Sequence, residues 1–293
     1  MPTPATQSLR EIHPRELKGL VKEIPTLPVI YQQLFEMMQD PEVSVPQLAE
    51  VISKDQALSA KILHLVNSAF YGVKREIKTI SRAVVILGFS AVRNAALAIS
   101  VFDYFKGEES NEQCSLEKFW EHSIAVASIC KVLTKKANLP WGEEAFVVGL
   151  LHDVGKLIMK KYFPTDFTEL GQHITTNQQN WYDGERELFK VNHAIIGKTV
   201  FRAWQFPDSL IEAVYLHHTP SSGASHPQLS ALAHLADYIS YHLEMGSPMS
   251  QPPSICDPEA LTIIGLTSAE ALSHSEDYTE EIRQAMSILD LVE

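Results

Sequence analysis

Residues 149–159 read GLLHDVGKLIM, and this stretch decides which fold the sequence predicts. It carries large aliphatic side chains at Leu150, Leu151, Val154, Leu157 and Ile158. A run this apolar predicts a buried helix. His152 and Asp153 nevertheless stand side by side in its middle, and ionisable side chains are seldom fully buried without partners or a metal ion. The stretch therefore predicts that a helical core and a polar site share one segment.

The composition is that of an ordinary globular chain of 293 residues, 45% hydrophobic and 20% charged, enough for one large or two modest domains. No run approaches the roughly 20 apolar residues that cross a bilayer, and the first residues lack the apolar region of a signal peptide. The cysteines Cys114, Cys130 and Cys256 are too scattered for a disulfide framework. We therefore expect a cytoplasmic protein without a membrane segment.

The formal net charge of −12 is distributed unevenly. Residues 1–110 contain 12 Lys or Arg and 12 Asp or Glu, whereas residues 241–293 contain 1 and 10. Because no segment has the basic excess typical of duplex binding, we do not expect a nucleic-acid partner. The acidic C-terminal part is typical of a solvated surface.

Helix signals recur along the chain, and strand signals are almost absent. Apolar residues at helical spacing predict a helix over 29–38. Ser44, Asp55 and Ser90 each precede such a pattern and are expected to cap the helix that follows. A long helix is expected over 116–137. The fold class predicted from these signals is all-α.

Polar stretches divide the chain into four expected parts. The run KGEESNEQCS at 106–115 and the run GSPMSQPPS at 246–254 are typical of boundaries. We expect an N-terminal tail (1–14), an N-terminal helical subdomain (15–110), a second helical subdomain (111–245) and an acidic, helical C-terminal segment (246–293).

Seven metal-competent residues lie on or beside predicted apolar helix faces. They come from five segments: His122, His152, Asp153, His193, His217, His218 and Asp237. A single histidine on such a face is more often a hydrogen-bonded core residue, and a His-His pair can simply end a helix. Burying each of these ionisable groups separately would carry a desolvation penalty of roughly several kcal/mol. A shared metal ion removes that cost.

Imidazole and carboxylate donors suit iron, manganese, nickel, cobalt or zinc better than calcium. Asp153 could bridge two ions roughly 3.5–4 Å apart, the spacing of two-metal hydrolytic sites. Lys156, one turn after His152, could present its charge to a phosphate; the alternative is an exposed lysine. The segment 160–190 is expected to be a loop that could cover the pocket.

The order of these residues resembles the HD superfamily of metal-dependent phosphohydrolases, in its HD-GYP-like version. The phrases that carry the resemblance are His122, HDVGK at 152–156, His193, HH at 217–218 and Asp237. Two further phrases, NSAFYG at 67–72 and AVVILG at 83–88, resemble the HDOD domain, the HD-related output domain of bacterial signalling proteins. The resemblance covers roughly residues 15–245.

The resemblance implies an N-terminal helical bundle packed on an HD-type, phosphodiesterase-like helical core at 111–245. It implies a bacterial, cytoplasmic regulatory or output module of signal transduction. It also implies one ion held by His122, His152, Asp153 and Asp237. A second ion would be held by Asp153, His193, His217 and His218. Iron is the expected metal, with manganese, nickel, cobalt and zinc as alternatives.

Two departures from the family pattern leave the function open between alternatives. Many HDOD members have lost the metal ligands, whereas here the set is intact. The loop after the paired histidines reads TPSSGASHPQLS (219–230) and lacks Gly-Tyr-Pro, so cyclic-di-GMP phosphodiesterase activity is not expected. We favour a regulatory module that binds an unidentified signalling partner. A phosphohydrolase that acts on a phosphate-containing ligand through Asp153 and Lys156 is the second hypothesis, and an iron-based redox or oxygen sensor is the third.

Overall fold

The computed structural model describes residues 14–24, 30, 33–34, 37, 43–68, 71–107, 115–245, 249, 256–273 and 275–291. Every regular element in these ranges is helical, so the predicted all-α class is confirmed. The helix expected over 29–38 lies largely outside the described residues. None of the described helices combines the length and apolarity that crossing a bilayer requires.

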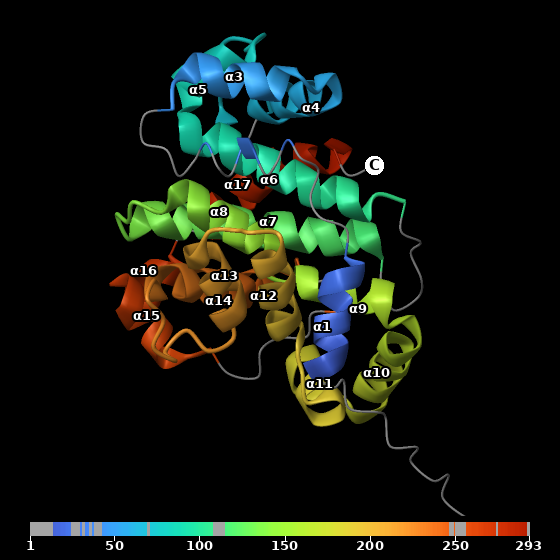
Figure 1. Cartoon of the computed structure of the whole chain (residues 1–293). Helices are drawn as coiled ribbons and strands as arrows, with labels where there is room; N and C mark the ends of the chain where they lie inside the picture. Colours follow the sequence, from blue (N-terminus) through green and yellow to red (C-terminus); the bar gives the residue numbers. More distant parts are fainter. Residues whose placement is uncertain are drawn as a thin grey trace, which may run out of the picture.

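The N-terminal layer consists of three short helices and a longer one (Figure 1). They are α3 (Val45–Ser53), α4 (Gln56–Val66), α5 (Ile80–Leu87) and the longer α6 (Phe89–Phe105). Two of the short helices, α4 and α5, pack on the longer one, and the third packs on those two. Each buries one apolar face, as the amphipathic pattern predicts. This layer lies on the far side of α7 and α8 from the candidate site.

Two of the three expected caps are confirmed, and the third is wrong. Ser44 is the N-cap of α3, and the Asp55 carboxylate accepts a hydrogen bond of 2.9 Å from the Leu58 amide at the start of α4. Ser90 does not cap a helix, because it lies inside α6. Gly88 adopts φ 92°, which only glycine reaches readily, so α5 ends there and α6 begins at the next residue.

The central layer is a hairpin of α7 (Leu116–Lys136) and α8 (Gly142–Leu151). Gly149 allows the two helices to approach closely, since a Cβ there would lie 2.7 Å from the Cα of Ala127. The rings of Phe102 and Trp120 meet edge to face at 4.5 Å and join α6 to α7. Helix α7 thus lies between the N-terminal layer and the site.

The lower layer lies on the side of α7 and α8 opposite to the N-terminal layer (Figure 1). It contains α9 (Val154–Tyr162), α10 (Pro164–Asn177), α11 (Trp181–Phe189), α12 (His193–Ala203), α13 (Asp208–Leu216) and α14 (Pro227–His242). Helix α1 (Pro14–Glu23) packs against α12. The prediction of a loop over 160–190 is wrong, because Pro164 and the capping residue Asn180 begin helices α10 and α11 there.

The C-terminal part folds back onto α7 and α14. It consists of α15 (Pro258–Ile264), α16 (Ser268–Leu272), α17 (Ser275–Ala285) and the 3-10 helix η2 (Met286–Leu291). Lys131 of α7 forms an ion pair of 2.7 Å with Glu281, and the Lys136 ammonium lies 4.9 Å from the ring centre of Tyr278. Part of the acidic segment is therefore docked on basic residues rather than simply solvated.

Helix α9 and the start of α12 pack backbone against backbone. A Cβ on Gly155 would lie 2.0 Å from the carbonyl oxygen of His193. Gly197 allows a similar fit one turn further along α12, where a Cβ would lie 3.1 Å from a methyl group of Val214 and 3.9 Å from the backbone nitrogen of Gly155. These two glycines set how closely α9, α12 and α13 approach one another.

We expect Gly155→Ala to lower the free energy of unfolding by about 3 kcal/mol, the upper part of the range for overpacking, because backbone atoms cannot move aside cheaply. Gly142→Ala, in α8, is the matched control: its Cβ meets nothing within 4 Å, so we expect a change below about 1 kcal/mol. Urea unfolding followed by circular dichroism measures both. Equal stability of the two variants would contradict the close α9–α12 contact.

Candidate metal centre

The structure brings all seven residues singled out in the sequence to one buried place. They come from α7, from the junction of α8 and α9, from the start of α12, from the end of α13 and from α14: His122, His152, Asp153, His193, His217, His218 and Asp237. All are buried except His218 and Asp237, which are partly exposed. These two residues lie on the solvent side of the cluster.

The helix predicted to run unbroken through 149–159 is interrupted. Helix α8 ends at Leu151, α9 begins at Val154, and Asp153 between them has φ −96° and ψ 2°. The His152 ring donates from Nδ1 to the carbonyl oxygen of Gly149 at 2.7 Å. Asp153 immediately precedes α9, where the helix dipole favours a negative charge. The interruption lets two consecutive side chains face the same site.

The Asp153 carboxylate lies between two groups of histidines. Its Oδ1 is 3.1 Å from Nε2 of His193 and 3.9 Å from Nε2 of His217. Its Oδ2 is 3.5 Å from Nε2 of His152 and 3.9 Å from Nε2 of His122. Each oxygen of this one carboxylate therefore faces a different pair of imidazoles.

The donor atoms form two compact sets that share Asp153. In the first set, the ligand atoms of Asp153, His193, His217 and His218 lie within 4.8 Å of one another. The second set, with the same limit, is His122, His152 and Asp153. Asp237 is beside this second set, because its Oδ1 lies 3.2 Å from Nε2 of His122 and 4.0 Å from Nε2 of His152.

Hydrogen bonds to carbonyl oxygens fix which ring nitrogen of three histidines carries the proton. Nδ1 of His122 lies 3.0 Å from the oxygen of Met245, and Nδ1 of His217 lies 2.6 Å from the oxygen of Val214. His152 makes the equivalent bond to Gly149. Because a carbonyl oxygen only accepts, Nδ1 must donate, and Nε2 of each ring is turned toward the cluster.

Glu185 is a residue of the site that the sequence reasoning missed. It is fully buried in α11, and its Oε2 accepts hydrogen bonds from Nδ1 of His193 at 2.7 Å and from the backbone amide of His193 at 2.8 Å. A carboxylate behind a histidine is the usual device that orients a metal-ligating imidazole. The signal was present in the sequence, since Trp181, Glu185 and Phe189 follow at intervals of four and share one buried helix face.

Lys156 is buried, with 4% of its side chain exposed, so the alternative of an exposed lysine is wrong. Its ammonium group lies 2.6 Å from Oδ2 of Asp153. Burial raises the pKa of the Asp153 carboxyl, but Lys156, His152 and His193 together hold it well below its usual range. Asp153 is therefore ionised in the folded chain.

The pKa values of the cluster histidines are shifted in opposite directions, according to the neighbours of each ring. Burial lowers the pKa of His217 and of His218 well below the ordinary value, and neighbouring imidazoles lower it further. Burial opposes the charge on His193 too, but Glu185 and Asp153 raise its pKa. Burial opposes the charge on His122 as well, but Asp237 and Asp153 raise its pKa.

The hydrogen bonding of three atoms at the centre of the cluster shows whether its residues fit a metal ion. His122 Nε2, His152 Nε2 and Asp153 Oδ1 are buried without a hydrogen-bond partner. Leaving such atoms unpaired costs about 1–3 kcal/mol each. Lone pairs of imidazole and carboxylate that converge and lack donors are what a transition-metal ion requires. The residues present therefore fit a metal ion.

His234 connects the site to the C-terminal part. Its Nδ1 donates to the carbonyl oxygen of His217 at 2.8 Å, and its Nε2 accepts a hydrogen bond of 2.8 Å from the backbone amide of Asp257. Both ring nitrogens are thereby occupied. His234 holds the main chain of a cluster residue in place and does not face the cluster itself.

Comparison with known proteins identifies the family of this chain. The family model of the HDOD domain matches residues 24–220, about two thirds of the chain. The chain belongs to the HDOD family. The resemblance found in the sequence is thus confirmed, and with it the all-helical HD-type fold of this HDOD protein.

Individual relatives are distant. A solved structure of a proposed phosphohydrolase from Shewanella amazonensis is 25% identical, with a TM-score of 0.74, over 94% of this chain and 98% of that one. An uncharacterised protein of Treponema pallidum is 21% identical over 80% of this chain and 45% of its own length. The cyclic di-GMP phosphodiesterase CdgJ of Vibrio cholerae is 26% identical over 44% of this chain and 29% of its own. The chain spans less than half the length of these two curated relatives.

We expect the rings of His152 and His217 to be neutral Nδ1–H tautomers, the minor form of free histidine in water. Long-range ¹H–¹⁵N correlation spectra of the chelated HDOD protein, assigned with His→Gln variants, test this at about pH 7.5. Because its pKa is lowered, His217 should stay neutral when the pH falls to about 6, where free histidine is mostly charged. Nε2–H signals, or titration of His217 near its ordinary value, would contradict the described geometry.

Proposed function

We propose that this HDOD chain is a regulatory module of signal transduction whose His/Asp cluster binds one or two divalent transition-metal ions. The observation that carries the proposal is the convergence of four imidazole Nε2 atoms on the two oxygens of the buried Asp153 carboxylate. Each separate polar burial would be costly, and one shared cation relieves the cost for all of them.

The proposed ligands of the two metal ions correspond to the two compact sets of donor atoms. His122, His152, Asp153 and Asp237 would hold one ion, and Asp153, His193, His217 and His218 would hold the other. Asp153 would bridge the two. Glu185 would fix the orientation of the His193 ring through its Nδ1 hydrogen bond. We propose iron first, with manganese, nickel, cobalt and zinc as the alternatives compatible with imidazole and carboxylate donors.

Hydrolysis of a phosphoester is the second function that a specific observation favours. Lys156 places a buried positive charge against Asp153, where it could neutralise an oxygen of a bound phosphoryl group. A bound metal would supply Lewis-acid stabilisation and a water of lowered pKa. His218 and Asp237, the partly exposed members of the cluster, lie where a ligand could enter. The similarity to a proposed phosphohydrolase supports this candidate.

Cyclic-di-GMP hydrolysis is not part of the proposal. The relative that is named for it matches this chain over only 29% of its own length. The segment 219–230, which follows the paired histidines, lacks the Gly-Tyr-Pro sequence of the HD-GYP enzymes that this chain resembles. The phosphoester of the second candidate is therefore not specified by that relative.

Elemental analysis tests the metal proposal directly. We expect about two transition-metal ions per chain in protein purified without air, and loss of both in Asp153→Asn, because each ion loses its shared ligand. Asp277→Asn, exposed on α17, is the matched control and should keep its metal. Absence of metal from the folded wild-type chain would contradict the proposal.

An assay of phosphoester hydrolysis distinguishes the regulatory module from the phosphohydrolase. The metal-loaded chain is assayed with bis(p-nitrophenyl) phosphate, beside Asp153→Asn and Lys156→Met. Metal-dependent hydrolysis that both variants lose would establish the phosphohydrolase. No hydrolysis, together with a stability that falls when the metal is chelated, would leave the regulatory module as the function.

We expect Glu185→Gln to weaken metal binding about 10- to 100-fold, the usual effect of removing a carboxylate behind a ligand histidine. Glu187→Gln, two residues along the same helix and exposed, is the control and should bind as the wild type does. Competition with a chromogenic chelator measures both affinities. An unchanged affinity in Glu185→Gln would show that His193 is not a ligand.

A further inference from the structure

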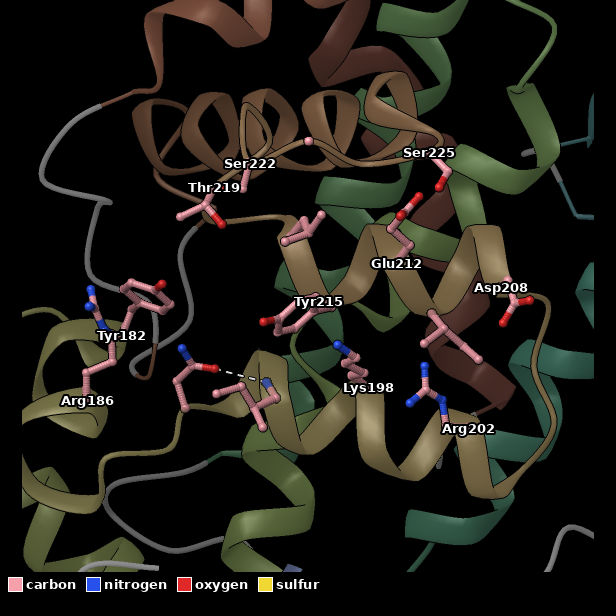
Figure 2. A pocket seen from close by; sticks show the side chains of 15 residues that line it. Tyr182, Arg186, Lys198, Arg202, Asp208, Glu212, Tyr215, Thr219, Ser222 and Ser225 are labelled. Atoms are coloured by element: carbon pink, nitrogen blue, oxygen red, sulfur yellow. Dashed lines mark hydrogen bonds between the residues drawn. The ribbon is translucent and has the colours of Figure 1, made fainter. Parts of the chain in front are cut away.

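A second hollow lies beside the metal centre (Figure 2). It is a groove of about 690 Å³ between α12 and α13, closed at one end by α11 and on one side by the loop that follows His218. Its size is within the range of small-molecule sites. The sequence reasoning did not identify it, because its residues come from three helices and a loop.

Three cations line the groove: Arg186 from α11, and Lys198 and Arg202 from α12. Lys198 and Arg202 are one helical turn apart on the same face, a spacing at which like charges repel. Neither forms an ion pair with any residue in the described part of the chain. Burial and the charge of Arg202 lower the pKa of Lys198, and the charge of Glu212 opposes them only in part. An anion between these side chains would relieve the repulsion.

Aromatic contacts position the cations without neutralising them. The Lys198 ammonium lies 3.6 Å from the ring centre of Tyr215, and the Arg186 guanidinium lies 5.4 Å from that of Tyr182. Two carboxylates, Asp208 and Glu212, also line the groove. Glu212 already accepts a hydrogen bond of 2.8 Å from the His226 amide. Three cations against these two carboxylates leave an excess of positive charge in a protein whose formal net charge is −12.

The groove and the metal centre share a wall. The ring of Tyr182 packs against the ring of His218 at 4.2 Å between centroids, and Tyr182 also lines the groove. Leu216 and Thr219, which flank the paired histidines, line it as well. A ligand that contacted Tyr182 in the groove would therefore lie next to the residue that packs on His218, a partly exposed member of the cluster.

We propose that this groove binds a nucleotide-type ligand with two separated phosphate groups, one at the His/Asp cluster and the other between Lys198 and Arg202. The proposal rests on the proposed metal centre for the first phosphate only. Lys156 provides the cation at the cluster, and Lys198 with Arg202 provides the cations at the far end. The Tyr182 ring between them offers an apolar surface to the ligand's sugar or base.

The test compares ligands that differ in the second phosphate. Adenosine 3′,5′-bisphosphate, a 5′-phosphorylated dinucleotide and 5′-AMP are titrated calorimetrically into the full chain, metal-loaded and chelated. The variant is Lys198→Gln/Arg202→Gln. The control is Lys78→Gln/Arg82→Gln, which removes the same charge from exposed positions of the N-terminal layer. Circular dichroism verifies that each variant is folded.

We expect the groove variant to bind the bisphosphate or the dinucleotide about 10- to 100-fold more weakly, as loss of charged hydrogen bonds does. Its affinity for AMP should change less than about threefold, and the control should bind like the wild type. Preference for the dinucleotide over the bisphosphate would identify which source of the second phosphate fits. Equal binding of all probes by the groove variant and the wild type, or no binding of any probe, would overturn the proposal.

The same titrations distinguish this proposal from the metal proposal. Binding by the chelated chain that the groove variant loses, in a protein that contains no metal as isolated, would support the groove and contradict the metal centre. Two bound metal ions, together with probe affinities that are unchanged in Lys198→Gln/Arg202→Gln, would support the metal centre and contradict the groove.

Discussion

The Asp153 carboxylate is the constraint on which the lower layer of this protein depends. One oxygen faces His193 and His217, and the other faces His152 and Lys156. A charged group at this depth is tolerated only where several elements deliver partners to it. The interruption between α8 and α9, the close α9–α12 contact at Gly155 and the position of α14 all serve that convergence. The arrangement of the helices is thus inseparable from the chemistry of their polar residues.

Much of this could be predicted from the sequence because the decisive signals are local. Capping residues and apolar spacing predicted the helix class, and the apolar face of α7 placed His122 inward. The seven cluster residues were recognised together because a set of ionisable groups on apolar faces calls for a common explanation. Those predictions needed only periodicity and the cost of burying charge.

The features that were missed depend on distances between elements. Glu185 matters because α11 places it behind His193, and nothing within its own helix reveals that neighbour. The break at His152 and Asp153 was hidden because the flanking residues are as apolar as those of a continuous helix. The groove could not be predicted, since Lys198 and Tyr215 belong to different helices. Three-dimensional contact, rather than composition, creates each of them.

The hydrogen bonds of His234 tie residues beyond the matched family region to the cluster. Similarity to the family model stops at residue 220, yet Asp237 and the amide of Asp257 lie beyond it. A fragment trimmed to the region of similarity would lose one carboxylate of the cluster and the whole of α14. A fragment ending before Asp257 would leave the Nε2 of His234 without its donor. The border drawn by sequence similarity therefore falls inside the packed structure, and the acidic C-terminal helices contact the helices that carry the cluster.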